Sequence, residues 1–155
     1  MPLQTGQPAP PFKSHDTEKN LVQLSDFNGK PVVLLFFPLA FTSTCTRELC
    51  SVRDDISAYN KVNAEVIGIS VDSLHSLKKY KEEQHLNFTL LSDFNKTISK
   101  DYDTIYETFG GWMHGVSKRS AFVIDQDGII RYTEVLEHAG DIPDLEAVKK
   151  TLQNL

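Results

Sequence analysis

The chain has 155 residues, a length typical of one domain, and we expect residues 1–155 to fold as a single domain. Hydrophobic residues make up 40% and charged residues 24%, as in ordinary globular proteins. The net charge is -5 without any run of Lys or Arg, which argues against a nucleic-acid partner, and no apolar run approaches the ~20 residues of a membrane-spanning helix.

In chain order, residues 1–6 come first and have neither the basic start nor the apolar stretch of a signal peptide, so we expect a cytoplasmic protein. Two alternating stretches on either side of residues 16–20 then predict a hairpin. Residues 31–37 are continuously apolar and rich in β-branched side chains, which is typical of a strand covered on both faces. Pro38 ends this strand.

Residues 44–60 carry the clearest helical pattern in the sequence. The apolar side chains of this segment repeat at helical spacing and lie within about 40° of one line along the helix. They are Cys45, Leu49, Val52, Ile56 and Tyr59. The pattern predicts one helix with this face turned toward the core.

Strands and helices alternate through the middle of the chain, and a hairpin and a helix follow. The strands are expected at 66–71, 88–91, 121–124 and 129–135, the last two joined by a turn at 125–128. The helices are expected from Asp72 or Ser73 to about residue 85, from Ser92-Asp93 to about residue 102, and from Pro143 onward.

This order of elements indicates the fold class. Parallel strands need helical crossovers, whereas a hairpin is antiparallel, so the sheet should be mixed. We therefore predict an α/β protein with a thioredoxin-like fold: a mixed central sheet, helices on both faces and an N-terminal hairpin extension.

Cys45 falls in the first turn of its predicted helix, directly after a strand and a loop. Helix N-termini have unpaired N–H groups and partial positive charge, which stabilise a thiolate. Cysteines placed in this way have pKa values of roughly 3.5 to 7.5, against ~8.5 for a free thiol, and are nucleophilic at neutral pH. The alternative is that Cys45 only fills space in the apolar face, as free cysteines often do.

Cys50 favours the first of these interpretations. It lies about 140° around the helix from Cys45, away from the apolar face, where a space-filling cysteine is not needed. The two Cα atoms are about 8.6 Å apart on an intact helix, whereas a disulfide requires less than about 7 Å. Either this disulfide never forms, or the first turns of the helix unwind when it does.

The loop before Cys45 resembles the active-site loop of a known family. Pro38, Thr42 and Cys45, in the spacing Pro-x-x-x-Thr-x-x-Cys after an apolar strand, resemble the motif of peroxiredoxins, which are thiol peroxidases with a thioredoxin fold. Glu48 and Arg119 fit the same family pattern. The likeness extends to residues 8–12 and 90–93, and so covers nearly the whole chain.

The resemblance implies a role for each of these residues. Cys45 would be the peroxidatic cysteine, which attacks peroxide and becomes a sulfenic acid. The Thr42 hydroxyl would orient the peroxide, and Arg119 would keep Cys45 ionised and stabilise the charge that moves onto oxygen. Pro38 would shape the wall of the pocket. Glu48 would orient neighbouring groups, or only interact with the helix dipole.

The role of Cys50 stays open. A second cysteine five residues after the first is similar to the Q-type (bacterioferritin comigratory protein) branch, in which Cys50 would be the resolving cysteine. Residues 36–42 are more similar to the alkyl hydroperoxide reductase E branch, whose members can work with one cysteine, and Cys50 would then be a bystander.

The expected function is thus reduction of hydrogen peroxide and organic hydroperoxides, with recycling by a thioredoxin- or glutaredoxin-like reductant, in a monomer or homodimer. A thiol–disulfide exchange protein is the alternative, but the chain lacks the Cys-x-x-Cys spacing of that class. A non-catalytic interaction module would not explain why the motif residues occur together. The histidines lack metal-ligand spacing and there is no phosphate-binding glycine motif, so we expect no metal and no cofactor.

Overall fold

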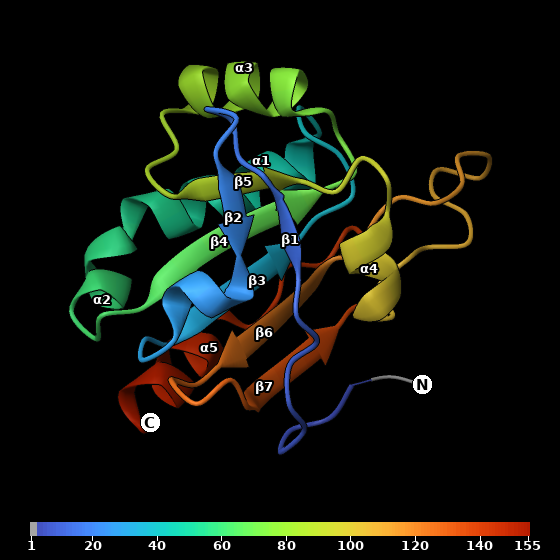
Figure 1. Ribbon diagram of the computed structural model, residues 1–155. Helices are drawn as coiled ribbons and strands as arrows, with labels where there is room; N and C mark the ends of the chain where they lie inside the picture. The colour runs from blue at the N-terminus through green and yellow to red at the C-terminus, as the bar shows by residue number, and fades with distance from the viewer. Residues whose placement is uncertain (1–2) are drawn as a thin grey trace.

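The computed structural model describes residues 3–155 and has a five-stranded sheet at its centre (Figure 1). The strands are β3 (Val32–Phe36), β4 (Glu65–Ser70), β5 (Thr89–Ser92), β6 (Ser120–Ile124) and β7 (Ile130–Val135). They stand in the order β5-β4-β3-β6-β7. Strands β3, β4 and β5 pair in parallel, whereas β6 is antiparallel to both β3 and β7. The predicted mixed sheet is confirmed.

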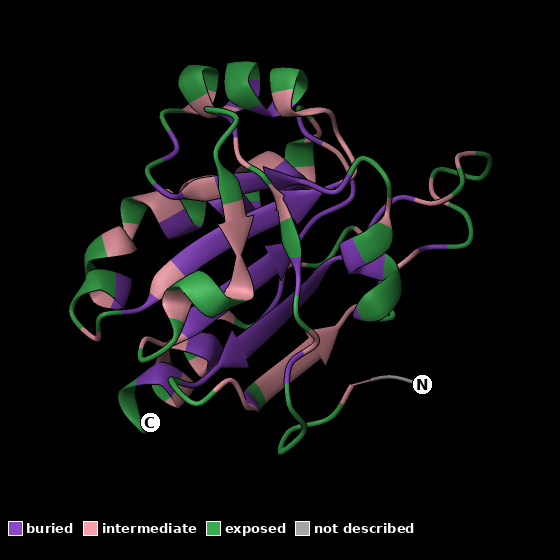
Figure 2. Ribbon diagram, viewed as in Figure 1, coloured by how far each residue is buried: buried purple, intermediate pink, exposed green. Residues whose placement is uncertain are grey.

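Both faces of the sheet are covered, as Figure 2 shows by the burial of its central strands. One face packs against α1 (Ser43–Asp54), α2 (Ile56–Asn60), α3 (Leu74–Gln84) and α5 (Leu145–Gln153). The other packs against α4 (Thr97–Asp101), the 3-10 turn η1 (Leu24–Phe27) and the hairpin of β1 (Lys13–His15) and β2 (Leu21–Gln23). The thioredoxin-like arrangement and the N-terminal hairpin extension are therefore as predicted.

The predicted helix over residues 44–60 is divided in two, and this prediction is corrected. Helix α1 ends at Asp54, and Asp55 leaves helical geometry with φ -118° and ψ 20°. Aspartate is a poor helix former, and the Asp55 carboxylate here pairs with Lys149 of α5. The apolar face itself is as predicted, because Cys45, Leu49, Val52 and Tyr59 are all buried.

Two helices begin later than predicted. Helix α4 begins at Thr97, because residues up to Lys96, which has φ +64°, form a turn. Asp93 still caps this helix, since its carboxylate accepts from the backbone N–H groups of Ile98 at 3.0 Å and Ser99 at 2.7 Å. Helix α5 begins at Leu145, two residues after Pro143, where the Asp144 side chain caps it.

The remaining predicted elements agree with the structure. Ser73, one of the two expected caps, accepts from the backbone N–H of Ser76 at the start of α3. The turn at residues 125–128 joins β6 to β7. Among residues 3–155, no helix is long and apolar enough to cross a membrane.

Candidate active site

The antiparallel pairing of β3 and β6 brings together two segments that are far apart in the sequence. Phe36 at the end of β3 lies opposite Ser120 at the start of β6. The loop that follows β3 and the residue that precedes β6 must therefore lie at the same edge of the sheet. This edge holds Pro38 and Thr42 on one side and Arg119 on the other.

The loop from β3 to α1 is fixed by contacts with β4 and α3. Pro38 is buried, and the backbone N–H of Ala40 donates to the Asp72 carboxylate at 2.8 Å. Phe41 has φ +68°, and its ring lies 5.0 Å from that of Tyr80. Thr42 follows this loop and occupies the N-cap position of α1.

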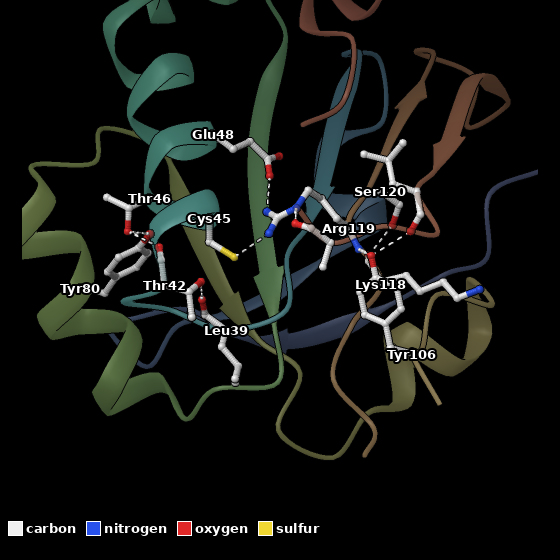
Figure 3. Close-up of polar contacts among 12 residues, drawn as sticks. Leu39, Thr42, Cys45, Thr46, Glu48, Tyr80, Tyr106, Lys118, Arg119 and Ser120 are labelled. Carbon is white, nitrogen blue, oxygen red and sulfur yellow. Dashed lines mark hydrogen bonds and ion pairs between the residues drawn. The ribbon is translucent and has the colours of Figure 1, made fainter. Parts of the chain in front are cut away.

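Cys45 lies in the first turn of α1 and is completely buried. Its sulfur accepts a hydrogen bond from Nη2 of Arg119 at 3.2 Å (Figure 3). Both cysteines of the chain are free. The structure thus combines a helix N-terminus with a contacting guanidinium, and both of these features stabilise a thiolate.

Arg119 is held in one orientation by three groups. Besides the bond to Cys45, Nη1 donates to Glu48 Oε1 at 2.8 Å, and Nε donates to the carbonyl of Ala139 at 2.9 Å. The residue is only 1% exposed. Burial opposes its charge, but Cys45 and Glu48 outweigh this effect and raise the pKa of Arg119 above its ordinary value. The residue is therefore a permanent cation beside the sulfur.

Glu48, one turn after Cys45, is also completely buried. Burial raises the pKa of Glu48 to about 7, although Arg119 acts to lower it, and Glu134 of β7 raises it further. Its second oxygen, Oε2, has no hydrogen-bond partner among the described residues. Glu48 is therefore a member of the site and not only a surface partner of the helix dipole.

Thr42 lies beside Cys45 in Figure 3. Its hydroxyl donates to the carbonyl of Leu39 at 2.7 Å, which leaves the lone pairs of its oxygen available as acceptors. The structure thus places Pro38, Thr42, Cys45, Glu48 and Arg119 at one edge of the sheet.

Cys50 is set apart from this group because its side chain faces α3. Its thiol donates to Oε1 of Gln84 at 3.6 Å, and it packs against the edge of the core. The expectation that no packing explains Cys50 is corrected, since α3 covers this side of α1.

Sequence reasoning missed two further contacts of the first turn of α1. The Thr46 hydroxyl has one hydrogen and donates to the carbonyl of Thr42 at 2.8 Å, so the hydroxyl of Tyr80, at 2.9 Å, donates to Thr46. Asp72, which sequence reasoning considered only as a helix cap, anchors Ala40 instead. The sequence carries one signal for this contact. Asp72 comes just after β4, and therefore lies at the end of the sheet where Pro38 follows β3.

Comparison with known proteins identifies the family. Residues 5–133 match the AhpC/TSA family. Peroxiredoxin Q, chloroplastic, from Oryza sativa subsp. japonica is 38% identical over 130 residues, which cover 84% of this chain and 58% of the rice protein. Peroxiredoxin Bcp from Escherichia coli (strain K12) is 36% identical over 132 residues, covering 84% of this chain and 85% of that protein. This chain is a peroxiredoxin of the Q/Bcp type.

Solved structures agree with this assignment. Peroxidoxin BcpB from Mycobacterium tuberculosis superposes with a TM-score of 0.87 and 30% identity, covering 99% of this peroxiredoxin and 98% of that chain. The reduced 2-Cys peroxiredoxin of Plasmodium vivax gives a TM-score of 0.84, with 98% and 81% covered. The resemblance to the Q-type branch is confirmed, and the thioredoxin-like fold with it. The peroxiredoxin spans little more than half the length of its rice relative.

The raised pKa of Glu48 predicts an unusual dependence of stability on pH. Between the ordinary value of 4.5 and the folded value of about 7, the folded protein holds a proton that the unfolded chain has released. The free energy of unfolding should therefore fall as pH rises through this window, by roughly 1–3 kcal/mol, and then level off. Denaturant unfolding of Cys45→Ser, in which no thiolate forms to release a proton of its own, measures this slope at several pH values.

The matched control is Asp54→Asn, which removes an exposed carboxylate from the same helix. Added to Cys45→Ser, Glu48→Gln should abolish the slope and Asp54→Asn should keep it. Parallel curves with and without Glu48→Gln would show that Glu48 is ionised throughout.

Proposed function

We propose that this peroxiredoxin reduces hydrogen peroxide and organic hydroperoxides with Cys45 as the attacking nucleophile. The observation that carries the proposal is the 3.2 Å contact between the Cys45 sulfur and the Arg119 guanidinium at a helix N-terminus. A buried thiolate needs a cation and hydrogen-bond donors, and Arg119 supplies both.

In the proposed reaction, the thiolate attacks one oxygen of the peroxide. A sulfur–oxygen bond forms and the oxygen–oxygen bond breaks, so that Cys45 becomes a sulfenic acid while the peroxide is reduced to water or an alcohol. Arg119 stabilises the negative charge that moves onto oxygen, and the Thr42 oxygen accepts a hydrogen bond from the peroxide. Pro38 forms part of the wall beside them.

The burial of Cys45 favours a small peroxide group over a protein disulfide. The side chain is 0% exposed, so a folded protein could not bring its disulfide to the sulfur without opening the site. A peroxide group is only two oxygen atoms long. This observation supports a peroxidase over the alternative of a thiol–disulfide exchange protein.

We further propose that Cys50 resolves the sulfenic acid by forming a disulfide with Cys45. The two residues lie on the intact helix α1, at a Cα separation of about 8.6 Å for ideal geometry, so its first turns must unwind. Unwinding breaks the bonds of Thr46 and withdraws Leu49 from the core. A thioredoxin- or glutaredoxin-like reductant would then restore both thiols.

The one-cysteine mechanism, with Cys50 a bystander, is the competing candidate. The contact of Cys50 with Gln84 is the observation that favours it.

The wider setting of this activity is also part of the proposal. We propose a single domain over residues 1–155, acting as a monomer or homodimer in the cytoplasm without metal or cofactor. Purification of the protein from its source by cell fractionation, with its mass measured in solution, tests the location and the assembly together.

Replacement of the proposed nucleophile is the direct test of the function. Cys45→Ser should abolish peroxide consumption driven by thioredoxin and its reductase, because a hydroxyl is not ionised at neutral pH. Circular dichroism should show an intact fold, since serine is nearly the same size. Substantial turnover by the folded variant would refute Cys45 as the nucleophile.

The resolving role of Cys50 has a separate test. Cys50→Ser should reduce one equivalent of peroxide and then stop as a sulfenic acid, which excess peroxide converts to sulfinic acid. In the wild type, hydrogen exchange of residues 42–52 should be faster in the disulfide form than in the reduced form. Full thioredoxin-driven turnover by Cys50→Ser, with equal exchange in the two redox forms, would establish the one-cysteine mechanism.

The bond between Tyr80 and Thr46 predicts control of unwinding from α3. Tyr80→Phe removes this bond at the first turn of α1 but keeps the aromatic ring beside Phe41. One neutral hydrogen bond contributes about 0.5–1.5 kcal/mol, so disulfide formation should become roughly 2- to 10-fold faster. The matched control is Tyr102→Phe, which loses a bond to the Pro10 carbonyl on the opposite face of the sheet. Stopped-flow measurement of disulfide formation should show acceleration in the first variant only; equal rates in both would show that the bond does not restrain α1.

A further inference from the structure

Two acidic groups share one cation in the buried part of the site. The sulfur of Cys45 and the carboxylate of Glu48 both accept hydrogen bonds from the guanidinium of Arg119, at 3.2 Å and 2.8 Å. All three residues are at most 1% exposed. Two anions beside one cation would leave a net negative charge in this buried space, which is strongly unfavourable.

The surrounding elements do not supply a second positive charge. On β7, Glu134 adds to the unfavourable field at Glu48. Tyr59 of α2 and Tyr80 of α3 are neutral phenols, since burial raises the pKa of both. Within residues 3–155, Arg119 is the one basic side chain bonded to Glu48 or Cys45. The charge at this site therefore has to be balanced by a proton.

The contacts of Glu48 indicate where the proton resides. Oε1 is bonded to Arg119, but Oε2 is buried without a hydrogen-bond partner among the described residues. A buried carboxylate with an unpartnered oxygen is costly, whereas a neutral carboxyl group loses much less on burial.

We propose that Cys45 and Glu48 share a single proton, which the Glu48 carboxyl group holds while Cys45 is a thiolate and releases when Cys45 is oxidised. This inference rests on the proposed role of Cys45 as nucleophile and adds a proton-balancing role for Glu48, beyond positioning Arg119. The pKa of Glu48, raised to about 7, supports it, because a group with this value can hold or release a proton near neutral pH.

The proposed step balances in atoms and charge. Before reaction, the thiolate is neutralised by Arg119 and Glu48 is protonated. Attack forms the sulfur–oxygen bond and breaks the oxygen–oxygen bond, with two electrons passing from sulfur to the peroxide. The leaving hydroxide is protonated to water at the expense of Glu48, whose carboxylate then pairs with Arg119 while Cys45 is a neutral sulfenic acid. No net proton is taken from solvent.

The test counts protons during one oxidation event. Reduced protein carrying Cys50→Ser, which prevents disulfide formation, is mixed with one equivalent of hydrogen peroxide in weakly buffered solution containing a pH indicator. Sulfenic acid on Cys45 is measured by mass spectrometry after trapping.

We expect no net proton uptake in the Cys50→Ser protein. With Glu48→Gln added, which keeps the acceptor for Arg119, we expect uptake of one proton per sulfur oxidised. Asp54→Asn, a carboxylate substitution at the far end of α1, should behave like the parent protein.

Two further measurements separate proton sharing from simple positioning. The infrared difference spectrum of the Cys50→Ser protein should show loss of a protonated carboxyl band on oxidation, and this result does not depend on whether Glu48→Gln folds. In the Cys50→Ser protein, the rate of Cys45 oxidation should decline as pH rises through about 7, because Glu48 then loses the shared proton, and adding Glu48→Gln should remove this decline. A residue that only positions Arg119 would change the rate at every pH and leave the decline in place.

The outcomes distinguish the two proposals. Equal proton counts with and without Glu48→Gln, or an unchanged carboxyl band while sulfenic acid forms, overturn proton sharing and leave the peroxidase mechanism intact. If no sulfenic acid forms on Cys45, the proposed function fails and the proton-sharing role fails with it.

Discussion

The placement of Arg119 is the constraint on which the rest of the site depends. A buried guanidinium would be very unfavourable without partners, and here each of its three nitrogens donates to a different group. Cys45 and Glu48 come from successive turns of α1, whereas the Ala139 carbonyl comes from the segment after β7. The cation thus joins the helix to the segment that follows β7, the outermost strand on this side of the sheet. Its position requires the antiparallel register of β3 and β6, because that register sets Arg119 across from the loop that begins α1. The fold determines the chemistry of the site through this pairing.

The parts that could be predicted from the sequence are those with a local signature. The apolar run of β3, the apolar face of α1 and the turn at residues 125–128 each follow from spacing or composition, and all are present. The motif residues Pro38, Thr42 and Cys45 were recognisable for the same reason, since they lie within one short segment. Arg119 entered only through the family resemblance, because periodicity does not show which residue of a later strand will face an earlier loop.

Other features could not be read from the sequence because they depend on contacts between distant segments. From the sequence, Asp72 is interpreted as an ordinary helix cap, but in the fold it lies after β4 and binds Ala40. From the sequence, Tyr80 is interpreted as a core aromatic residue, but in the fold α3 places its hydroxyl beside that of Thr46. The break at Asp55 coincides with an ion pair to Lys149, a residue of the last helix. In each case a short polar side chain or a phenol was visible in the sequence, but its partner was set by the tertiary structure.

The proposed mechanism places two opposing requirements on α1. The proposed attack on peroxide needs the first turn folded, because Arg119 contacts the sulfur in that state. The proposed disulfide needs the same turn open. The first turns of α1 are held by the bonds of Thr46 with Thr42 and Tyr80, by the bonds of Arg119 to Cys45 and Glu48, and by burial of Leu49. The neutral hydrogen bonds contribute about 1 kcal/mol each, the bonds to the guanidinium about 1.5–3 kcal/mol each, and burial of Leu49 about 1.5–3 kcal/mol. Tyr59 of α2 lies beyond the segment that opens and keeps the remainder of the helical layer on the sheet. The proposed opening leaves the sheet in place but separates Arg119 from Cys45 and Glu48, so that of its three partners the Ala139 carbonyl remains.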